Sequence, residues 1–280
     1  MQHRNDIDGL RALAVLPILL FHAGVTALGG GFVGVDIFFV ISGFLITSII
    51  LREAEGGRFS MLEFYRRRVA RIFPALFATI AVTLAAGCVL LFAGELRSLA
   101  RSAAAATGFV SNIFFWWNTD YFGEAAEAKP LLHTWSLGVE EQFYLFYPPL
   151  LILVRRWWPG RLRAVLALAT LLSFLVSLWQ TRHAETAAFY LLPSRAWELG
   201  LGALVAAGAF PALRSARLRG AASAAGLAAI VLGIVAIRPD SAFPAPWALL
   251  PCIGAALLIA YGESASTGRL LGWRRCARSG

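Results

Sequence analysis

Residues 32–51 have the sequence FVGVDIFFVISGFLITSIIL, an apolar run of twenty residues in which Asp36 is the only charged side chain. A helix needs about 20 apolar residues to cross a hydrocarbon layer about 30 Å thick. Seven further segments are similarly apolar, namely 10–27, 72–93, 134–154, 164–181, 187–209, 220–237 and 245–261. We therefore expect an all-α polytopic membrane helix bundle with about eight transmembrane helices.

The composition of the 280-residue chain also indicates a membrane protein. Hydrophobic residues make up 59% and charged residues 15%, and the mean hydropathy is +0.69. Soluble domains are about 45–50% apolar and about 25% charged. The three cysteines are not spaced as metal ligands, so we expect no metal site.

Arginine and lysine residues indicate the orientation in the membrane. With a cytoplasmic N-terminus, the cytoplasmic loops 52–71, 155–163, 210–219 and 262–280 carry 17 of these residues, against five in the opposite loops. This asymmetry follows the positive-inside rule if residues 103–117 do not cross. We therefore expect 103–117 to form a re-entrant or interfacial helix on the outer side. The net charge of +9 belongs to these loops, so we expect no nucleic-acid partner.

Arg11 and His22 are ionisable residues in or beside the first apolar segment, where such groups usually face a protein interior or a water-filled site. Their spacing of eleven residues places both on one face of a helix, about 16 Å apart along the axis. That face presents an anion-binding group near the cytoplasmic end and a proton-handling group further out. The alternative is a topology anchor and a structural histidine.

Residues 133–144, HTWSLGVEEQFY, introduce polar groups into another apolar segment. On a helix, His133, Ser136, Glu140 and Tyr144 lie within about 60° of one another. Two adjacent carboxylates in a span need protonation, a cation or a wet cavity. The alternative is favourable interaction with the helix dipole, which suits acids in the first turn. The later position of Glu140 and Glu141 favours a polar site.

Arg195 and Glu198 are three residues apart and can form an ion pair on one helix face. The sequence does not decide whether these two residues form a structural ion pair or contact a ligand directly, and the same two alternatives apply to Asp36. A cytoplasmic cluster of Arg66, Arg67, Arg68 and Arg71 could bind a polyphosphate or anionic lipid headgroups. The residues alone therefore fit either an acyl or phosphoryl transferase or a transporter.

Several of these motifs resemble the membrane proteins of acyltransferase family 3. The resemblance begins with DIDGLRALAV at 6–15, FHAG at 21–24 and GGFVGVDIFFVISGFLIT at 30–47. The family's pattern of an arginine, ten residues and a histidine falls on Arg11 and His22, and its arginine-rich motif falls on Arg68 and Arg71. Residues 133–144 and 193–202 also resemble family signatures.

The resemblance implies an O-acyltransferase of the bacterial inner membrane. Such an enzyme takes an acyl group, here acetyl, from a cytoplasmic coenzyme A thioester. It transfers the group to a hydroxyl of an extracytoplasmic glycan, such as lipopolysaccharide O-antigen or exopolysaccharide. The expected partners are therefore acyl-CoA as the donor, a carbohydrate acceptor and the lipid bilayer, with no bound cofactor.

The resemblance also suggests roles for the singled-out residues. The coenzyme phosphates would dock on the arginine cluster, with Arg11 at the inner end of the same path. His22 would act as general base or accept the acyl group itself, and the residue pattern leaves both open. Asp36 and Glu140 would orient the imidazole. The remaining candidates would bind substrate or stabilise the oxyanion, and they are His133, Trp135, Ser136, Arg195 and Glu198.

The relatives also set an expectation for the extent of the domain. In them a similar basic segment leads into two further membrane helices, and an SGNH-type hydrolase domain follows the membrane part. We expect residues 1–280 to form an acyltransferase family 3 membrane domain without these parts. The alternative function is a transporter or flippase for an anionic substrate, with Arg195 and Glu198 as gating charges, although we find no internal symmetry of the kind transporters show.

Overall fold

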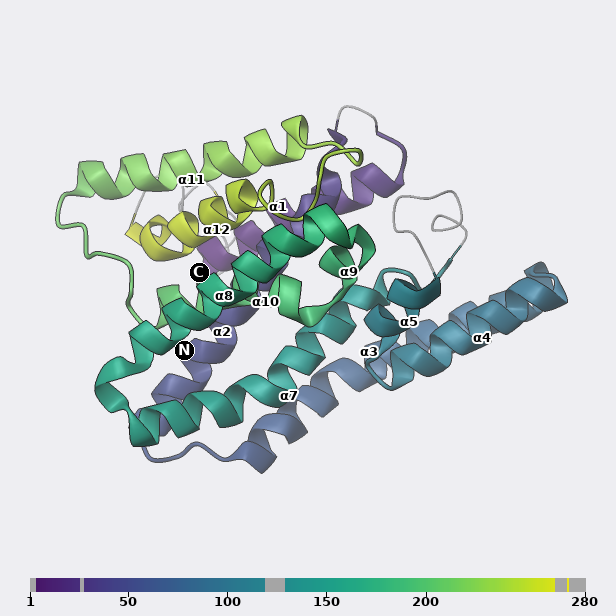
Figure 1. Ribbon diagram of the computed structural model, residues 1–280, viewed down its shortest axis with the longest axis horizontal. Coiled ribbons are helices and arrows are strands. Elements are labelled where there is room, and N and C mark those ends of the chain that lie inside the picture. The colour runs from purple at the N-terminus through teal and green to yellow at the C-terminus, as the bar shows by residue number, and fades with distance from the viewer. Residues whose placement is uncertain (1–3, 26–27, 119–128, 265–270, 272–280) are drawn as a thin grey trace, which may run out of the picture.

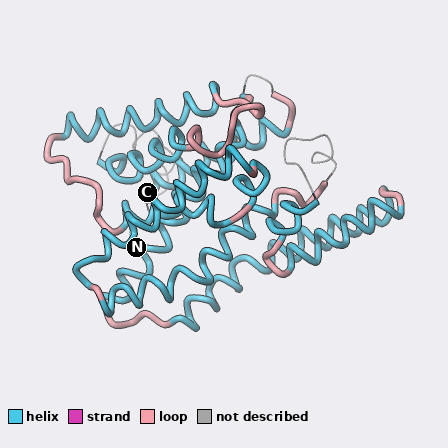
Figure 2. Tube along the Cα trace, viewed as in Figure 1, coloured by secondary structure: helices cyan, strands magenta, loops and turns pink. Residues whose placement is uncertain are grey.

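The computed structural model describes residues 4–25, 28–118, 129–264 and 271 of the chain. Within these ranges the chain forms helices that are joined by turns and loops, and it contains no β-strand (Figures 1 and 2). This confirms the all-α prediction. The elements are α1 (Asn5–His22), η2 (Gly31–Val33), α2 (Gly34–Glu55), α3 (Met61–Leu90), α4 (Ala93–Thr107), α5 (Ser111–Asn118), α7 (Thr134–Trp157), η3 (Pro159–Arg161), α8 (Leu162–His183), α9 (Glu185–Tyr190), α10 (Leu192–Ala206), α11 (Ala216–Ala236), α12 (Leu249–Tyr261) and η4 (Gly262–Ser264).

Helices cover most of the described residues of the eight predicted apolar segments, but these helices do not all meet the requirements for crossing a membrane. Four helical stretches in the described residues are long and apolar enough, namely Gly31–Glu55, Met61–Leu90, Pro159–His183 and Ala216–Ala236. The apolar helix α12 is shorter. The structure therefore supports a multi-pass membrane protein and does not confirm the number of eight crossings.

Two predicted continuous segments are broken in the structure. Residues 103–117 fall in α4 and α5, and the chain turns between them at Phe109, which has a φ of 54°. Residues 187–209 fall in α9 and α10, which separate at the extended residue Leu191. Pro193 occupies the first turn of α10, where the missing N–H of a proline does no harm. The expected single helix over 103–117 is therefore wrong in its boundaries.

Helix α2 lies in the interior of the bundle, with α1, α7, α10 and α12 against it (Figure 1). Its closest partner is α10. A Cβ atom on Gly43 would collide with the carbonyl of Leu199, and a Cβ atom on Gly202 would collide with the carbonyl of Val40. Two glycines thus bring the two backbones together, as small residues do between membrane helices.

We predict that Gly202→Ala destabilises the protein by about 1–3 kcal/mol, the range for adding atoms to a full interior. The matched control is Gly220→Ala in α11, where a Cβ atom meets nothing within 4 Å. Alanine there should stabilise the helix by about 0.5–1 kcal/mol. Thermal unfolding of both variants in mild detergent measures the difference. Equal unfolding temperatures would contradict the close α2–α10 contact.

Helices α3 and α4 form a hairpin that extends away from the rest of the bundle (Figure 1). The hairpin has a small apolar core that is separate from the main one. Leu131, which precedes α7, completes this core beside the hairpin residues Leu76, Ile80, Leu99, Ala103 and Ala106. The N-terminal part of α3 remains beside α7, where the Tyr65 hydroxyl donates to the carbonyl of Leu145 at 2.8 Å. This contact brings the arginine cluster on α3 next to the polar residues of α7.

Candidate active site

His22 lies in the last turn of α1, with its side chain exposed. Its Nδ1 atom is 2.8 Å from the carbonyl oxygen of Ile18. Because a carbonyl oxygen only accepts hydrogen bonds, Nδ1 carries the hydrogen and donates it. The Nε2 atom of the neutral ring then has a free lone pair, as a general base or a nucleophile requires. The helix itself thus orients the imidazole.

Arg11 lies on the same helix as His22, because α1 continues without a break from Asn5 to His22. This continuity is what the predicted shared face requires. The Arg11 Nη1 atom is 3.4 Å from Asp8 Oδ1, one turn earlier. This ion pair is partly exposed, so the guanidinium remains accessible to a second anion.

His133 lies within electrostatic range of His22, a relation that the sequence does not predict. Burial lowers the pKa of the His133 imidazole, a hydrogen bond to the carbonyl of Pro130 raises it, and the nearby His22 lowers it. His133 immediately precedes α7, so the end of α1 and the beginning of α7 together present two imidazoles. The Ser136 hydroxyl donates to the carbonyl of His133 at 3.2 Å, so it is engaged with its own helix.

Glu140 forms a polar contact between α2 and α7. Its Oε1 atom accepts a hydrogen bond from Ser42 at 2.7 Å, and its Oε2 atom accepts one from Tyr144 at 3.4 Å. Among the described residues Glu140 has no hydrogen bond to His22, so the predicted orienting contact is absent from this structure. Instead, Arg68 and Arg71 lie within electrostatic range of Glu140, and the Arg68 guanidinium stacks 4.7 Å from the Tyr144 ring centroid.

The four arginines of the predicted phosphate site point in different directions. Arg66 pairs with Glu63 at 2.7 Å on the same helix, and Arg67 pairs with Glu53 at the end of α2 at 2.8 Å. Arg68 stacks on Tyr144 of α7, and both Arg68 and Arg71 lie within electrostatic range of Glu140. The four arginines therefore do not converge on one site, and two of them lie nearer Glu140.

Asp36, Arg195 and Glu198 form a buried ion-pair cluster. Arg195 Nη2 donates to Asp36 Oδ1 at 2.8 Å and lies 3.2 Å from Glu198 Oε2. The three side chains are 0–1% exposed. The second distance confirms the predicted pairing of Arg195 with Glu198. The expectation that Asp36 orients His22 is not met, because its carboxylate is directed at Arg195.

The surroundings of Arg195 exclude solvent. Its guanidinium carbon lies 5.3–5.6 Å from the ring centroids of four aromatic residues, which are Phe39, Trp135, Phe189 and Phe243. Trp135, a predicted substrate contact, is thus buried against Arg195. Together these contacts make Arg195, Glu198 and Trp135 an internal cluster that a glycan cannot reach in this conformation.

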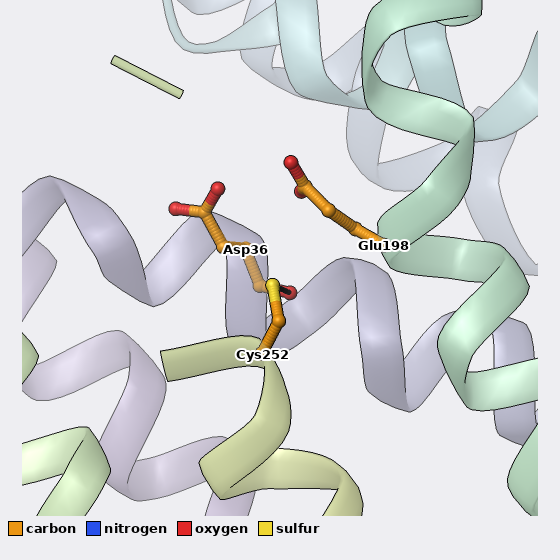
Figure 3. Close-up of side chains that lie close together, drawn as sticks. All are labelled: Asp36, Glu198 and Cys252. Atoms are coloured by element: carbon orange, nitrogen blue, oxygen red, sulfur yellow. Dashed lines mark hydrogen bonds between the residues drawn. The ribbon is translucent and has the colours of Figure 1, made fainter. Parts of the chain in front are cut away.

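Asp36 and Glu198 also lie near the thiol of Cys252 on α12 (Figure 3). One donor atom from each of the three residues falls within 4.8 Å of the others, a spacing that a metal ion could bridge. However, the Arg195 guanidinium already supplies the positive charge between the two carboxylates. The donor set therefore fits an ion-pair cluster better than a metal centre.

The sequence did not identify the partners that complete these contacts. Ser42 and Thr47 lie in the apolar run of α2, and the Thr47 hydroxyl is 2.7 Å from the Tyr147 hydroxyl. A hydroxyl in a helix often bonds to its own backbone, so neither residue points to a polar site by itself. The two hydroxyls form polar contacts because α7 lies alongside α2.

The fold and site define a multi-pass helical membrane protein with an exposed histidine and internal polar clusters. Residues 4–273 match the family model of the acyltransferase domain, acyltransferase family 3. The chain belongs to this family. The match covers the motifs around His22, Arg68, Glu140 and Arg195.

Curated relatives share part of the chain. It is 43% identical over 174 residues to "O-acetyltransferase OatA" of Staphylococcus aureus strain NCTC 8325, covering 60% of this chain and 28% of the relative. It is 38% identical over 181 residues to "Peptidoglycan O-acetyltransferase OatA" of Listeria monocytogenes, covering 63% of this chain and 28% of the relative. The chain thus aligns with little more than a quarter of each relative. No solved structure matches it significantly.

Proposed function

We propose that the chain is the membrane part of an O-acetyltransferase in the bacterial inner membrane, with its N-terminus in the cytoplasm. It takes acetyl from a cytoplasmic acyl-CoA and transfers it to a hydroxyl of an extracytoplasmic glycan. Family membership and the relatives' names support the reaction class. The observation that carries the proposal is His22, whose Nδ1–H donates to the Ile18 carbonyl and leaves the lone pair on Nε2 in the neutral ring.

The chemistry at His22 follows from this tautomer. As a general base, Nε2 takes the proton of the acceptor hydroxyl while the oxygen attacks the acetyl carbonyl carbon. The carbon–sulfur bond breaks, and the leaving thiolate receives the proton from the imidazolium. As a nucleophile, Nε2 instead attacks the acetyl carbonyl carbon first, and the carbon–sulfur bond breaks to release the coenzyme A thiolate. The acceptor hydroxyl then takes the acetyl group from the imidazole, and its proton passes to the thiolate. Both routes use the same atom.

The donor phosphates are assigned to Arg68 and Arg71, which adjoin Glu140 and Tyr144. Arg66 is less suited because Glu63 already holds it through two hydrogen bonds at 2.7 and 2.9 Å. Arg11 would extend the path toward His22 along α1. A guanidinium matches the geometry of phosphate oxygens, which makes arginine suitable for this role.

We predict that Arg68→Ala and Arg71→Ala raise the apparent KM for acetyl-CoA about tenfold, since a charge-assisted hydrogen bond contributes about 1.5–3 kcal/mol. The matched control Arg66→Ala should leave KM nearly unchanged. Initial rates at varied acetyl-CoA give the three values. Unchanged KM in both variants would make the arginines topology signals only.

The experiment that identifies the acceptor varies the kind of glycan and the side of the membrane on which it is added. The name of the Listeria relative includes peptidoglycan, whereas the family resemblance suggests lipopolysaccharide O-antigen or exopolysaccharide. Vesicles containing the protein should transfer radiolabel from acetyl-CoA on the cytoplasmic face to one of these glycans on the opposite face. Transfer only when donor and acceptor share a side would contradict the proposal.

A further inference from the structure

An apolar pocket lies between α7, α8 and α10, apart from the candidate active site. Its volume is about 180 Å³, and its walls include Leu151 and Val154 of α7, Leu162 and Leu166 of α8, and Ala196 of α10. Apolar cavities of about 150 Å³ remain dry and accept apolar ligands. The volume therefore suits part of a hydrocarbon chain.

The polar atoms in the pocket walls are already hydrogen-bonded. The Thr170 hydroxyl donates to the carbonyl of Leu166 at 2.7 Å, and the Tyr147 hydroxyl is 2.7 Å from the hydroxyl of Thr47. Neither group needs a water molecule or a polar ligand. An occupant of the pocket thus gains mainly from apolar contact, which contributes about 0.8 kcal/mol for each buried CH₂ group.

The mouth of the pocket opens toward the bilayer. Two of the lining residues, Leu150 and Ala169, are exposed, and the adjoining surface of α7 and α8 carries the exposed apolar side chains of Leu153, Leu168 and Leu172. A surface of this kind faces lipid in a membrane protein. A hydrocarbon chain could enter from the bilayer without passing through water.

A group of basic residues adjoins the same end of the pocket. The end of α7, the connecting η3 and the beginning of α8 carry four arginines, at positions 155, 156, 161 and 163, close in sequence to Val154 and Leu162 of the wall. Arg155 pairs with Glu55 at 3.6 Å, and Arg163 donates to the carbonyl of Ala207 at 2.9 Å.

The other two arginines of this group are available to a ligand. Arg156 and Arg161 are exposed, and no hydrogen bond or ion pair within the described ranges engages their guanidinium groups. Trp157, between them in sequence, is 61% exposed, as is typical of tryptophan at headgroup level. Arginines at the cytoplasmic face favour anionic lipid headgroups.

We propose that this pocket binds an anionic glycerophospholipid, with one acyl chain between α7, α8 and α10 and the headgroup phosphate on Arg156 and Arg161. Charge complementarity and the apolar mouth together select this occupant. The binding is separate from acetyl transfer and does not depend on the proposed function.

The test uses phosphatidylglycerol with a photoreactive acyl chain and the 280-residue protein in mild detergent. Crosslinking followed by peptide mapping should label residues of α7 and α8 that line the pocket. A phosphatidylcholine probe, whose zwitterionic headgroup has no net charge, should label them at least fivefold less, since each arginine near a headgroup with net negative charge contributes about fivefold. Equal labelling by the two lipids would show a general lipid shell and overturn the proposal.

Two pairs of variants locate the acyl chain and the headgroup. Ala169→Phe fills the mouth and should abolish pocket labelling, whereas Ala167→Phe, exposed on the same helix outside the pocket, should not. The double variant Arg156→Gln, Arg161→Gln should reduce labelling to the phosphatidylcholine level, unlike Arg214→Gln, Arg217→Gln. Undiminished labelling in Ala169→Phe, or labelling by a photoreactive palmitoyl-CoA but not by phosphatidylglycerol, would overturn the proposal.

Discussion

Replacing His22 with alanine should lower acetyl transfer at least a hundredfold without reducing the amount of protein in the membrane. A positioned general base contributes about 10²–10⁴-fold, and a nucleophile would be lost altogether. The side chain is exposed, and its one hydrogen bond among the described residues is to the Ile18 carbonyl of its own helix, so its loss should not disturb the fold. Transfer is measured from radiolabelled acetyl-CoA in vesicles, with protein content measured in the same membranes.

The chain offers a matched control for this experiment. His183 lies in the last turn of α8, and its Nδ1 atom is 2.8 Å from the carbonyl oxygen of Trp179, as in His22. His183→Ala removes an imidazole in the same local geometry at a different place. It should retain wild-type activity. Activity above about a tenth of wild type in His22→Ala would reject the role of His22, because a loss of less than about tenfold is smaller than the contribution of such a base.

Replacing Arg195 with leucine should destabilise the protein by about 3–5 kcal/mol, the usual effect of removing one partner from a buried ion pair. Asp36 and Glu198 would then lie in an apolar interior without a counter-charge. Among the described residues, aromatic rings pack around Arg195, and they cannot replace its positive charge. Thermal unfolding in mild detergent, followed by circular dichroism, measures the effect.

A compensated variant separates the loss of charge balance from the loss of side-chain volume. Asp36→Asn, Arg195→Leu and Glu198→Gln together leave no buried charge, and complete replacement of a buried ion cluster is often nearly neutral. The triple variant should therefore recover most of the lost stability. If it is as unstable as Arg195→Leu alone, packing around the guanidinium is the main contribution of Arg195.

The sequence predicted the helices well because their signal is local. An apolar run such as 32–51 fixes both the helix and its burial. The pairing of Arg195 with Glu198 was also predictable, since residues three apart on a helix are neighbours. Pro193 marks the beginning of α10, and more weight on this residue would have predicted the break at Leu191.

The contacts between distant segments could not be predicted. Asp36 and Arg195 are 159 residues apart, and nothing in the sequence around Asp36 distinguishes an arginine partner from a histidine partner. The partner of Glu140 could not be predicted either, because Ser42 is a single hydroxyl residue in an apolar run. A single sequence shows which groups need a partner in a membrane, but only the packing of helices shows which partner they receive.

The cluster of Asp36, Arg195 and Glu198 also limits how this chain can diverge. Loss of Arg195 alone leaves two acids without a counter-charge in an interior without water, so intermediates that carry this single change are selected against. Changes at the three positions should therefore be inherited together. Across homologous chains we expect covariation between α2 and α10, with a neutral residue at position 195 accompanied by the loss of the acids at positions 36 and 198.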